Sequence, residues 1–366
     1  MRIGIFLGHP AHYHLFKYTI ENLRNKGHSI DILVKRKDIL ESLVQEAGLD
    51  YIVVREHERL SSSKINIIWE TVKMDLKVCK YLIRKRPSLM IGTYAPLFSG
   101  YLGIPIIVCN EDDADAVPRF AKVGYPRADA ILTPSFCNCG KWEFKAIKYK
   151  GYQKLAYLHP NEFTPNLDTA QKYLRNKNKP YVLMRFSRFN AHHDDGAHGM
   201  SNQLAQRIIS LLSDEYDVYI TSERTLDASL EKYCLHINQL DIHHLMAFAS
   251  LYVGDSQSMS VEAAMLGVPC IRFNSFVGKL KVGVLEELEG KYHLIKSIHS
   301  SKPEELIETI HRILNSPSEK EMHLKRKNRM LTEKIDVTAF FTWLIDNYPD
   351  SLRQMRKNPE IQNQFQ

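Results

Sequence analysis

The sequence lacks several features that would assign it to a special class of protein. It has no apolar run near the roughly 20 residues that a membrane-spanning helix needs, no low-complexity tract and no short repeat. Its six cysteines are scattered, and Cys137 and Cys139 are not joined by the second pair that a structural zinc site would require. We therefore expect free thiols in a reducing compartment, and we exclude a disulfide scaffold, a solenoid and a membrane-spanning fold.

The first residues also lack the features of a secretion signal. A short apolar run breaks at Gly8, His9 and Pro10, and no small-residue cleavage site follows it. We interpret the run as a first buried strand, which predicts a cytoplasmic protein.

What the sequence does contain is typical of a globular protein of two domains. Of its 366 residues, 44% are hydrophobic and 25% are charged. Residues 1–160 carry 24 Lys and Arg against 16 Asp and Glu, whereas residues 161–366 carry 25 against 26. The basic half suits an anionic partner, and because no nucleic-acid-binding module is present, we expect peripheral contact with a membrane surface rather than with nucleic acid. A solvated basic face is the alternative.

Strand-like segments alternate with segments of helical periodicity, which predicts parallel sheets with crossover helices. The strand-like segments are residues 3–7, 29–34, 50–56, 89–93, 104–110 and 128–135, followed after a linker at 157–171 by residues 181–186, 217–222, 251–255 and 269–274. The helical segments are residues 15–25, 37–49, 65–84, 96–102, 203–214, 243–250, 260–267, 302–316 and 336–349. The predicted fold class is α/β, with two doubly wound, Rossmann-like domains, 1–160 and 161–335, that face a cleft. A C-terminal helix in 336–366 is expected to cross back and pack on the first domain.

Small polar residues stand where the strand at 251–255 passes into a helix, and ligands of open parallel sheets bind beyond such strand ends. These residues are Ser256, Gln257, Ser258 and Met259. A helix N-terminus offers unpaired N–H groups and the positive end of a dipole to phosphate oxygens. Glu262, expected in the first turn, could accept hydrogen bonds from ribose. The alternative is structural: Ser258 or Ser260 caps the helix, and Glu262 only complements its dipole.

The stretch 241–274 resembles the donor site of GT-B glycosyltransferases and of non-hydrolysing UDP-N-acetylglucosamine 2-epimerases. That resemblance implies that Ser256, Gln257 and Ser258 hold a nucleotide diphosphate and that Glu262 binds ribose, although Gln257 stands where glycine is common. Further segments, among them "GHPAHYHLFK", "GYQKLAYLHPNEFTP" and "RFSRFNAHHDDGAHG", are similar to an uncharacterised prokaryotic family of predicted GT-B glycosyltransferases. The family implies the GT-B fold and nucleotide-sugar chemistry.

Three histidines, His9, His12 and His14, follow the first strand. The glycosyltransferase that completes lipid II has a His in this loop, two residues before the first helix, and His12 matches it best. A His of near-neutral pKa could deprotonate an acceptor hydroxyl or position the donor, with His9 as a second substrate contact. The alternative is a His that caps the helix or packs against it.

The segment after the strand at 181–186 is rich in charged and His residues. Arg185 and Arg188 could neutralise a diphosphate leaving group. His192, His193, Asp194, Asp195 and His198 have the chemistry of a metal cluster. Adjacent side chains diverge, and GT-B enzymes generally work without a bound metal. We therefore expect these residues to bind sugar and phosphate, and we expect His193 to have a catalytic role as well. We expect no metal and no cofactor.

The remaining candidates also follow strands or border the linker. Glu111 and Asp112, with Asp113 and Asp115 behind them, offer a catalytic base or the N-cap of the next helix. Donor-pocket residues are expected at Thr221, Ser222 and Glu223. His243 lies in the expected nucleotide region or only begins a helix, and His159 could face the cleft.

Together these features predict a metal-independent glycosyltransferase that moves a sugar from a nucleotide-sugar, expected to be a UDP-sugar, to a saccharide or lipid-linked acceptor in cell-surface polysaccharide or glycolipid assembly. The 2-epimerases resemble the chain but use acidic residues that the segments "MIGTYAPL" and "VPRFAK" lack, although Glu111 fits one position. Two further hypotheses are a metal-dependent hydrolase built on residues 192–195 and a nucleotide-sugar-binding protein without catalysis.

Overall fold

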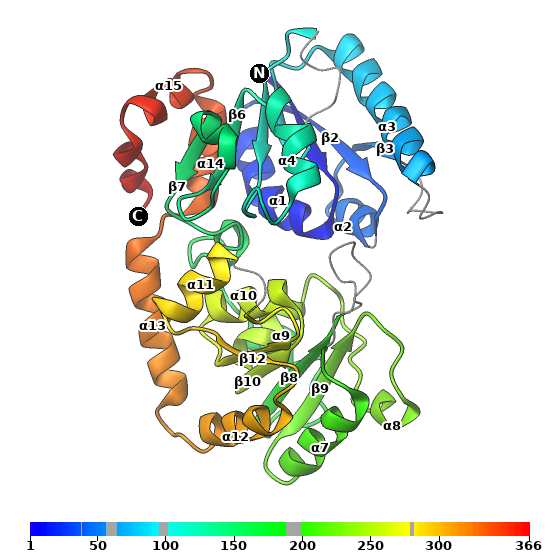
Figure 1. Cartoon of the computed structure of the whole chain (residues 1–366), viewed down its shortest axis with the longest axis vertical. Helices are drawn as coiled ribbons and strands as arrows, with labels where there is room; N and C mark the ends of the chain where they lie inside the picture. The colour runs from blue at the N-terminus through cyan, green and yellow to red at the C-terminus, as the bar shows by residue number, and fades with distance from the viewer. Residues whose placement is uncertain (38, 56–63, 95–101, 188–198, 279–281) are drawn as a thin grey trace. The chain divides into compact units, whose positions relative to one another are not determined.

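A computed structural model of the chain describes residues 1–37, 39–55, 64–94, 102–187, 199–278 and 282–366 (Figure 1). The chain divides into two compact units by its internal contacts. Unit 1 comprises Met1–Glu162 and Lys334–Gln366, and unit 2 comprises Phe163–Glu333. Each unit has its own parallel sheet, so the predicted α/β fold class with two doubly wound domains is confirmed.

Within the described residues, the sheet of unit 1 has seven strands in the order β3-β2-β1-β4-β5-β6-β7, and all neighbouring strands are parallel. The strands are β1 (Arg2–Leu7), β2 (Ser29–Lys35), β3 (Tyr51–Arg55), β4 (Leu89–Gly92), β5 (Ile106–Cys109), β6 (Ala130–Pro134) and β7 (Ala146–Tyr149). The central strands are nearly continuous apolar runs because helices cover both faces of a parallel sheet. The chain order reverses between β1 and β4, which is where ligands of such sheets bind.

The helices of unit 1 come from both ends of the chain. They are α1 (Pro10–Asn25), α2 (Leu40–Glu46), α3 (Lys64–Lys85), α4 (Pro118–Gly124), α5 (Leu155–Leu158), α14 (Val337–Asp346) and α15 (Asp350–Lys357), with 3-10 turns η2 (Tyr125–Arg127), η3 (Gly140–Lys145) and η4 (Pro359–Phe365). Helix α1 begins at Pro10, five residues earlier than predicted, because proline suits the first position of a helix. The predicted helix at 96–102 falls almost wholly outside the described residues.

The C-terminal helix α14 packs against α1, as predicted. The Phe341 ring lies 6.2 Å from that of Phe16, and Phe340 and Leu344 are fully buried beside it. Thr338 donates a hydrogen bond to the Ala156 carbonyl at 2.6 Å. These contacts make residues after 334 part of the core of unit 1.

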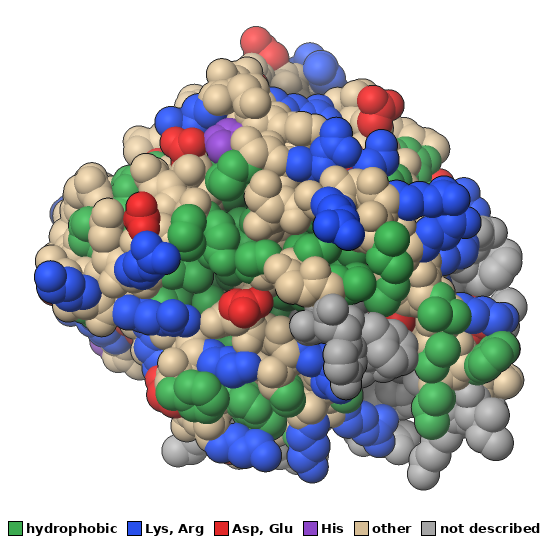
Figure 2. All heavy atoms as spheres, turned by 90° about the horizontal axis from the view of Figure 1, so that it is seen from above, with side chains coloured by type: hydrophobic (Ala, Val, Ile, Leu, Met, Phe, Trp, Pro, Cys, Tyr) green, Lys and Arg blue, Asp and Glu red, His purple; other side chains and the backbone are tan. Residues whose placement is uncertain are grey.

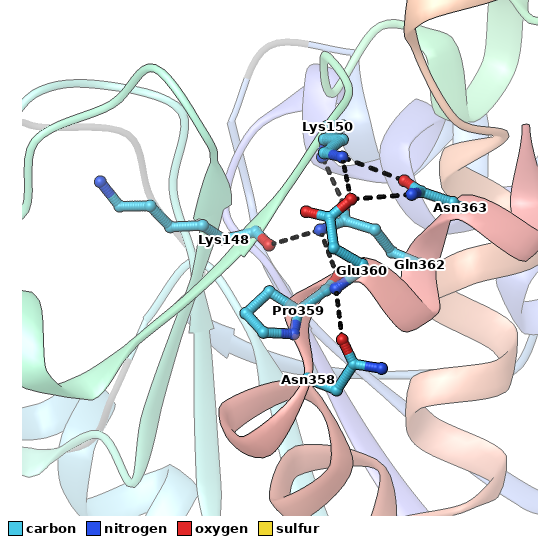
Figure 3. A network of polar contacts seen from close by, with 7 residues as sticks. All are labelled: Lys148, Lys150, Asn358, Pro359, Glu360, Gln362 and Asn363. Carbon is cyan, nitrogen blue, oxygen red and sulfur yellow. Dashed lines mark hydrogen bonds and ion pairs between the residues drawn. The ribbon is translucent and has the colours of Figure 1, made fainter.

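The last turn of the chain, η4, closes the open edge of the same sheet (Figure 3). The Lys150 N–H, just after β7, donates to Gln362 Oε1 at 2.6 Å, and the Lys150 ammonium contacts Glu360 at 2.6 Å and Asn363 at 3.1 Å. Gln362 Nε2 in turn donates to the Lys148 carbonyl at 3.4 Å. Pairing side chains with an edge strand leaves fewer unpaired backbone groups for another chain to bind.

The sheet of unit 2 has five parallel strands in its described residues, in the order β12-β11-β10-β8-β9. They are β8 (Tyr181–Phe186), β9 (Asp217–Ser222), β10 (Leu251–Gly254), β11 (Cys270–Asn274) and β12 (Lys296–His299). The helices are α6 (Leu167–Gln171), α7 (Asn202–Leu212), α8 (Ala228–Glu231), α9 (Ile242–Phe248), α10 (Gln257–Leu266), α11 (Gly283–Gly290), α12 (Pro303–Leu314) and α13 (Glu319–Glu333). No described helix is both long enough and apolar enough to cross a bilayer.

Candidate functional site

Three neighbouring strands of unit 2 end at one edge of the sheet, and predicted site residues follow each of them. Strand β8 lies between β9 and β10, so Arg185 is level with Thr221 on one side and with Gly254 on the other. A Cβ atom on Gly254 would come within 2.8 Å of the Arg185 Cβ, which shows how closely the two strands approach. The end of β8 therefore lies directly beside the loop that begins α10.

Helix α10 begins at Gln257, earlier than the sequence pattern indicated. Its N-cap is Ser256, whose Oγ accepts the Met259 N–H at 3.3 Å, so the structural alternative, in which Ser258 or Ser260 caps the helix, is wrong. The Ser260 hydroxyl donates to the Ser256 carbonyl at 2.7 Å. Ser258 is exposed in the first turn. The N–H groups of Gln257 and Ser258 precede the first intrahelical bonds, which leaves them available to an anion.

Glu262 is the sixth residue of α10 and lies in its second turn, so its predicted place in the first turn is wrong. Its carboxylate is 3.4 Å from Nε2 of His243, and both side chains are largely buried. His243 is the second residue of α9, so it does lie near a helix start, and its ring lies 6.2 Å from that of Phe163. The dipole role of Glu262 is weak beyond the first turn, whereas His243 holds its carboxylate in one orientation.

Arg185 forms an ion pair with Glu223, which follows β9. The Arg185 side chain is mostly buried, and its Nε–H has no acceptor within the described part of the chain. Ser222 has a structural contact instead: its hydroxyl donates to the Arg224 carbonyl at 2.6 Å and shapes the turn after the strand. Arg185 is therefore a cation at the edge, and its Nε–H has no acceptor among the residues that the structure describes.

Asp255 belongs to this edge, although the sequence pattern did not single it out. It follows β10 directly and is 2% exposed. Its Oδ1 accepts the Ser187 N–H at 2.6 Å, and its carbonyl accepts Asn274 Nδ2 at 2.9 Å. Burial raises the pKa of this carboxyl to about 6. The sequence feature that could have identified Asp255 is an acidic residue directly after a strand of uncharged, largely apolar residues.

Part of the predicted site lies outside the described residues. These residues are Arg188, His192, His193, Asp194, Asp195 and His198. Among the residues that are described, no group of three or more His, Cys, Asp or Glu side chains is placed to hold a metal ion. The expected absence of a metal stays a prediction.

In unit 1, the two predicted histidines lie at the start of α1 rather than in a loop well before it. His9 is the N-cap and accepts the Ala11 N–H at 3.2 Å, and His12 is the third residue of the helix. Burial, together with nearby Lys37, lowers the pKa of His9 to about 3. Burial and the neighbouring His9 lower the pKa of His12 well below its ordinary value.

The tautomer of His12 follows from its contacts. Nδ1 accepts the Gly8 N–H at 3.0 Å and lies 2.8 Å from the Thr93 hydroxyl. The proton of the neutral ring is therefore on Nε2, which makes His12 a hydrogen-bond donor. Of the two roles predicted for it, general base or positioning group, this arrangement favours the second. His14, the third histidine of the cluster, packs against Tyr157 inside unit 1.

Glu111 follows β5, and its Oε1 accepts a hydrogen bond from the buried Lys154 ammonium at 2.5 Å. Its Oε2 is buried and has no hydrogen-bond partner among the described residues. Asp112 lies next to it in the same loop, where its carbonyl accepts the Asn110 amide at 2.8 Å. Lys154 also contributes to lowering the pKa of both His9 and His12. Glu111 therefore belongs to the same electrostatic cluster as the histidines.

Other predicted residues of unit 1 have structural contacts. Asp113 accepts the Asn138 N–H at 2.7 Å and ties two loops together. The N-cap of α4 is Val117, so the N-cap role predicted for the acidic residues of this loop is wrong. His159 lies 3.8 Å from Asp336, which is itself the N-cap of α14.

A model of the family described as Protein of unknown function (DUF354) matches residues 1–339, so the chain belongs to this family. No match was found among curated protein sequences. Solved structures with a similar fold include the UDP-GlcNAc 2-epimerase of Neisseria meningitidis bound to UDP-GlcNAc, with 14% identity and a TM-score of 0.68 over 97% of this chain and 100% of that one. The glycosyltransferase of kitacinnamycin has 13% identity and a TM-score of 0.62 over 94% and 98% of the two chains.

A third similar structure is the S. aureus MnaA–UDP complex, with 11% identity and a TM-score of 0.64 over 96% of this chain and 97% of that one. Together these similarities confirm the GT-B fold and the resemblance that the sequence indicated.

Proposed function

We propose that the protein is a glycosyltransferase that takes a sugar from a nucleotide-sugar bound by unit 2. The observation that carries the proposal is the position of Arg185, beside the N-terminus of α10 at the carboxyl edge of the sheet. A guanidinium whose Nε–H has no acceptor among the described residues and helix N–H groups without intrahelical acceptors suit the two phosphates of a nucleoside diphosphate. The UDP and UDP-GlcNAc in the similar structures support uracil as the base.

The same groups would serve the chemical step. When the glycosidic bond to phosphate breaks, negative charge grows on the departing diphosphate. Arg185 and the N–H groups of Gln257 and Ser258 would stabilise that charge where it develops. Met259 and Glu223 would border the donor pocket. Arg188, His192, His193 and Asp194 lie outside the described residues, and we propose that they contact sugar and phosphate. We propose no metal and no cofactor.

Glu262 would bind the ribose. A carboxylate accepts hydrogen bonds from two vicinal hydroxyl groups, and the contact with His243 keeps Glu262 in place before the nucleotide arrives. This arrangement distinguishes a nucleotide from inorganic diphosphate.

Unit 1 would bind the acceptor, which we propose to be a saccharide or a lipid-linked saccharide of the cell surface. Glu111 would take the proton from the attacking hydroxyl, since Lys154 donates to Oε1 while Oε2 has no hydrogen-bond partner in the described part of the chain. His12 would donate from Nε2 and position the substrate, with His9 ordering the start of α1.

A UDP-sugar 2-epimerase is the second candidate, favoured by the TM-score of 0.68 to the Neisseria meningitidis enzyme. Incubation with a panel of UDP-sugars and candidate acceptors separates the two. Free UDP with a glycosylated acceptor supports transfer, epimerised UDP-sugar supports epimerisation, and binding without turnover of any sugar contradicts both.

The site itself is tested by calorimetry of UDP and uridine. We expect Arg185→Met to weaken UDP about tenfold to a hundredfold, since hydrogen bonds to charged groups contribute about 1.5–3 kcal/mol, and to leave uridine unaffected. Arg207→Met is the matched control, because Arg207 is an exposed arginine of α7 paired with Glu304 on the surface. Equal UDP affinity in both variants would contradict the proposed diphosphate site.

A further inference from the structure

Helix α3 of unit 1 exposes large apolar side chains that the proposed reaction does not use. Trp69, Leu76 and Ile83 are 59%, 58% and 58% exposed, and Ile68 is 64% exposed. Trp69, Leu76 and Ile83 are seven residues apart, which places them on one line along the helix. The opposite face of α3 packs into the core of unit 1, so this line points away from it.

The buried face of α3 is already complete. Met74, Val78 and Leu82 lie in the core, and the buried Asp75 is hydrogen-bonded by the Tyr94 hydroxyl. The exposed apolar line is therefore not part of the core of unit 1, and large apolar side chains aligned on an exposed surface are typical of an interaction site.

Basic side chains flank the apolar line on the exposed surface of the same helix. They are Lys73, Lys77, Lys80 and Arg84. At about 100° per residue, Lys73 and Lys80 lie within about 40° of the apolar line. The acidic residue Glu70 is paired with Lys73 at 3.1 Å, and the acidic Asp75 is buried. The exposed surface of the C-terminal half of α3, from Lys77 to Lys85, is thus positively charged.

This combination matches one kind of partner better than others. The cores of protein–protein interfaces are depleted in lysine, whereas a lipid surface accepts lysines because their apolar stems lie along the acyl boundary and their ammonium groups reach the headgroups. Trp is favoured at that boundary. The face drawn in Figure 2 has many Lys and Arg side chains and few acidic ones, in line with the basic composition of residues 1–160.

We propose that α3 lies in the plane of a membrane surface and binds anionic lipid headgroups, with Trp69, Leu76 and Ile83 inserted between them. The helix does not meet the requirements for crossing a bilayer, so it would lie on the membrane rather than span it. Attraction between lysines and anionic lipids makes this binding sensitive to salt.

The chain contains three tryptophans, Trp69, Trp142 and Trp343, which allows a direct test. Trp142→Phe combined with Trp343→Phe leaves Trp69 as the single reporter. We expect its fluorescence to shift to shorter wavelength with phosphatidylglycerol vesicles and not with phosphatidylcholine vesicles, and the shift to fall as salt is raised. An unchanged spectrum together with no co-sedimentation with phosphatidylglycerol vesicles would overturn the proposal.

Two paired variants separate insertion from attraction. We expect Leu76→Ser with Ile83→Ser, and separately Lys77→Glu with Lys80→Glu, each to weaken co-sedimentation at least tenfold. The matched control is Leu324→Ser with Lys325→Glu on α13, which removes an exposed leucine and an exposed lysine from another basic helix. Circular dichroism verifies the fold of each variant.

A second copy of the chain is the competing occupant of this surface. Sedimentation velocity identifies it: a dimer that Leu76→Ser with Ile83→Ser converts to monomer, with vesicle binding unchanged, would replace the lipid proposal. The α3 variants leave the residues proposed to bind UDP intact, so failure here does not bear on the glycosyltransferase proposal.

Discussion

Asp255 is an acidic group buried at the edge where we place an anionic ligand. Its Oδ1 is held by the Ser187 N–H, and it lies one residue before the N-cap of α10. A charged carboxylate there would repel a diphosphate and would also be poorly solvated. Burial raises its pKa to about 6, so a modest fall in pH neutralises it.

The raised pKa of Asp255 makes the stability of the folded protein depend on pH. The ordinary pKa of the group is 3.8, so between about pH 4 and 6 the folded protein holds more protons than the unfolded chain, and stability falls as pH rises through that window. Asp255→Asn removes this contribution. We expect the variant to gain about 1.4 kcal/mol of stability over wild type as pH rises from 5 to 7.5, because wild type loses the proton of Asp255 near pH 6 and one pKa unit is worth about 1.4 kcal/mol. Urea unfolding at the two pH values measures the gain, and a difference that does not change with pH would contradict the assignment.

Glu262 is the residue that we expect to bind the ribose of the nucleotide. If it binds ribose, Glu262→Gln should weaken the preferred nucleoside diphosphate about tenfold to a hundredfold. Because Glu262 lies beyond the first turn of α10, the loss of a favourable dipole contact should be negligible. Calorimetry with UDP, GDP and CDP makes the measurement. Ser258→Ala is the comparison variant and should weaken diphosphates more than nucleosides. Unchanged affinity in Glu262→Gln would remove the ribose assignment.

At the scale of elements, α10 depends on local bonds at each end. Ser256 caps its first turn, and Gly267 ends it with φ +77°, a conformation that side chains with a Cβ adopt at a cost. Between the two, Ala263 and Ala264 are fully buried and let the helix lie close to its sheet. The caps and the close packing therefore fix the position and direction of the N-terminus of α10.

The contribution of the Ser256 N-cap to the unfolding free energy should therefore be measurable separately. Ser256→Ala removes the acceptor of the Met259 N–H and should cost about 1 kcal/mol of unfolding free energy. Ser258→Ala, two residues along in the exposed first turn, should cost less than about 0.5 kcal/mol. Denaturant unfolding of both variants compares them. Equal losses would mean that Ser256 does not act as the cap.

Elements with continuous apolar runs were predictable from the sequence, whereas one edge strand of each sheet and one polar helix were not. Strands β7 and β12 were missed because they are four residues long and bury few side chains, Ile147 and Tyr149 in β7 and Ile298 in β12. Helix α13 was missed because it is strongly polar and buries few residues. The early start of α1 had a signal, Pro10 at its first position.

The candidate site was predictable only in part. Its residues follow strands, and the order of strands and helices places them at one edge of a sheet. The contact between His243 and Glu262 joins two helices, and the pairing of Glu111 with Lys154 joins segments 43 residues apart. Such contacts depend on tertiary packing, which no local pattern encodes.

At the scale of the whole molecule, the chain builds unit 1 from both of its ends. Residues 1–162 form the sheet, and residues 334–366 cover α1 and the edge strand β7. The N-cap of α14, Asp336, is bonded by Asn161 at 2.9 Å, so the segment that leaves unit 1 and the segment that returns to it are joined. Unit 1 is therefore complete only after the rest of the chain has been made.

Deleting residues 336–366 tests that dependence. The deletion removes five buried apolar side chains of α14, namely Val337, Phe340, Phe341, Leu344 and Ile345. Burial of each is worth about 1.5–3 kcal/mol, so their loss is comparable to the whole stability of a typical domain, about 5–15 kcal/mol. We expect the truncated protein to be insoluble or to unfold at a much lower temperature.

Deleting only residues 359–366 removes η4 and its bonds to Lys150 while it leaves α14 in place, and should have a smaller effect. Soluble expression and thermal unfolding of both truncations give the comparison. If loss of residues 336–366 left solubility and unfolding temperature unchanged, the packing of α14 on α1 would not support unit 1.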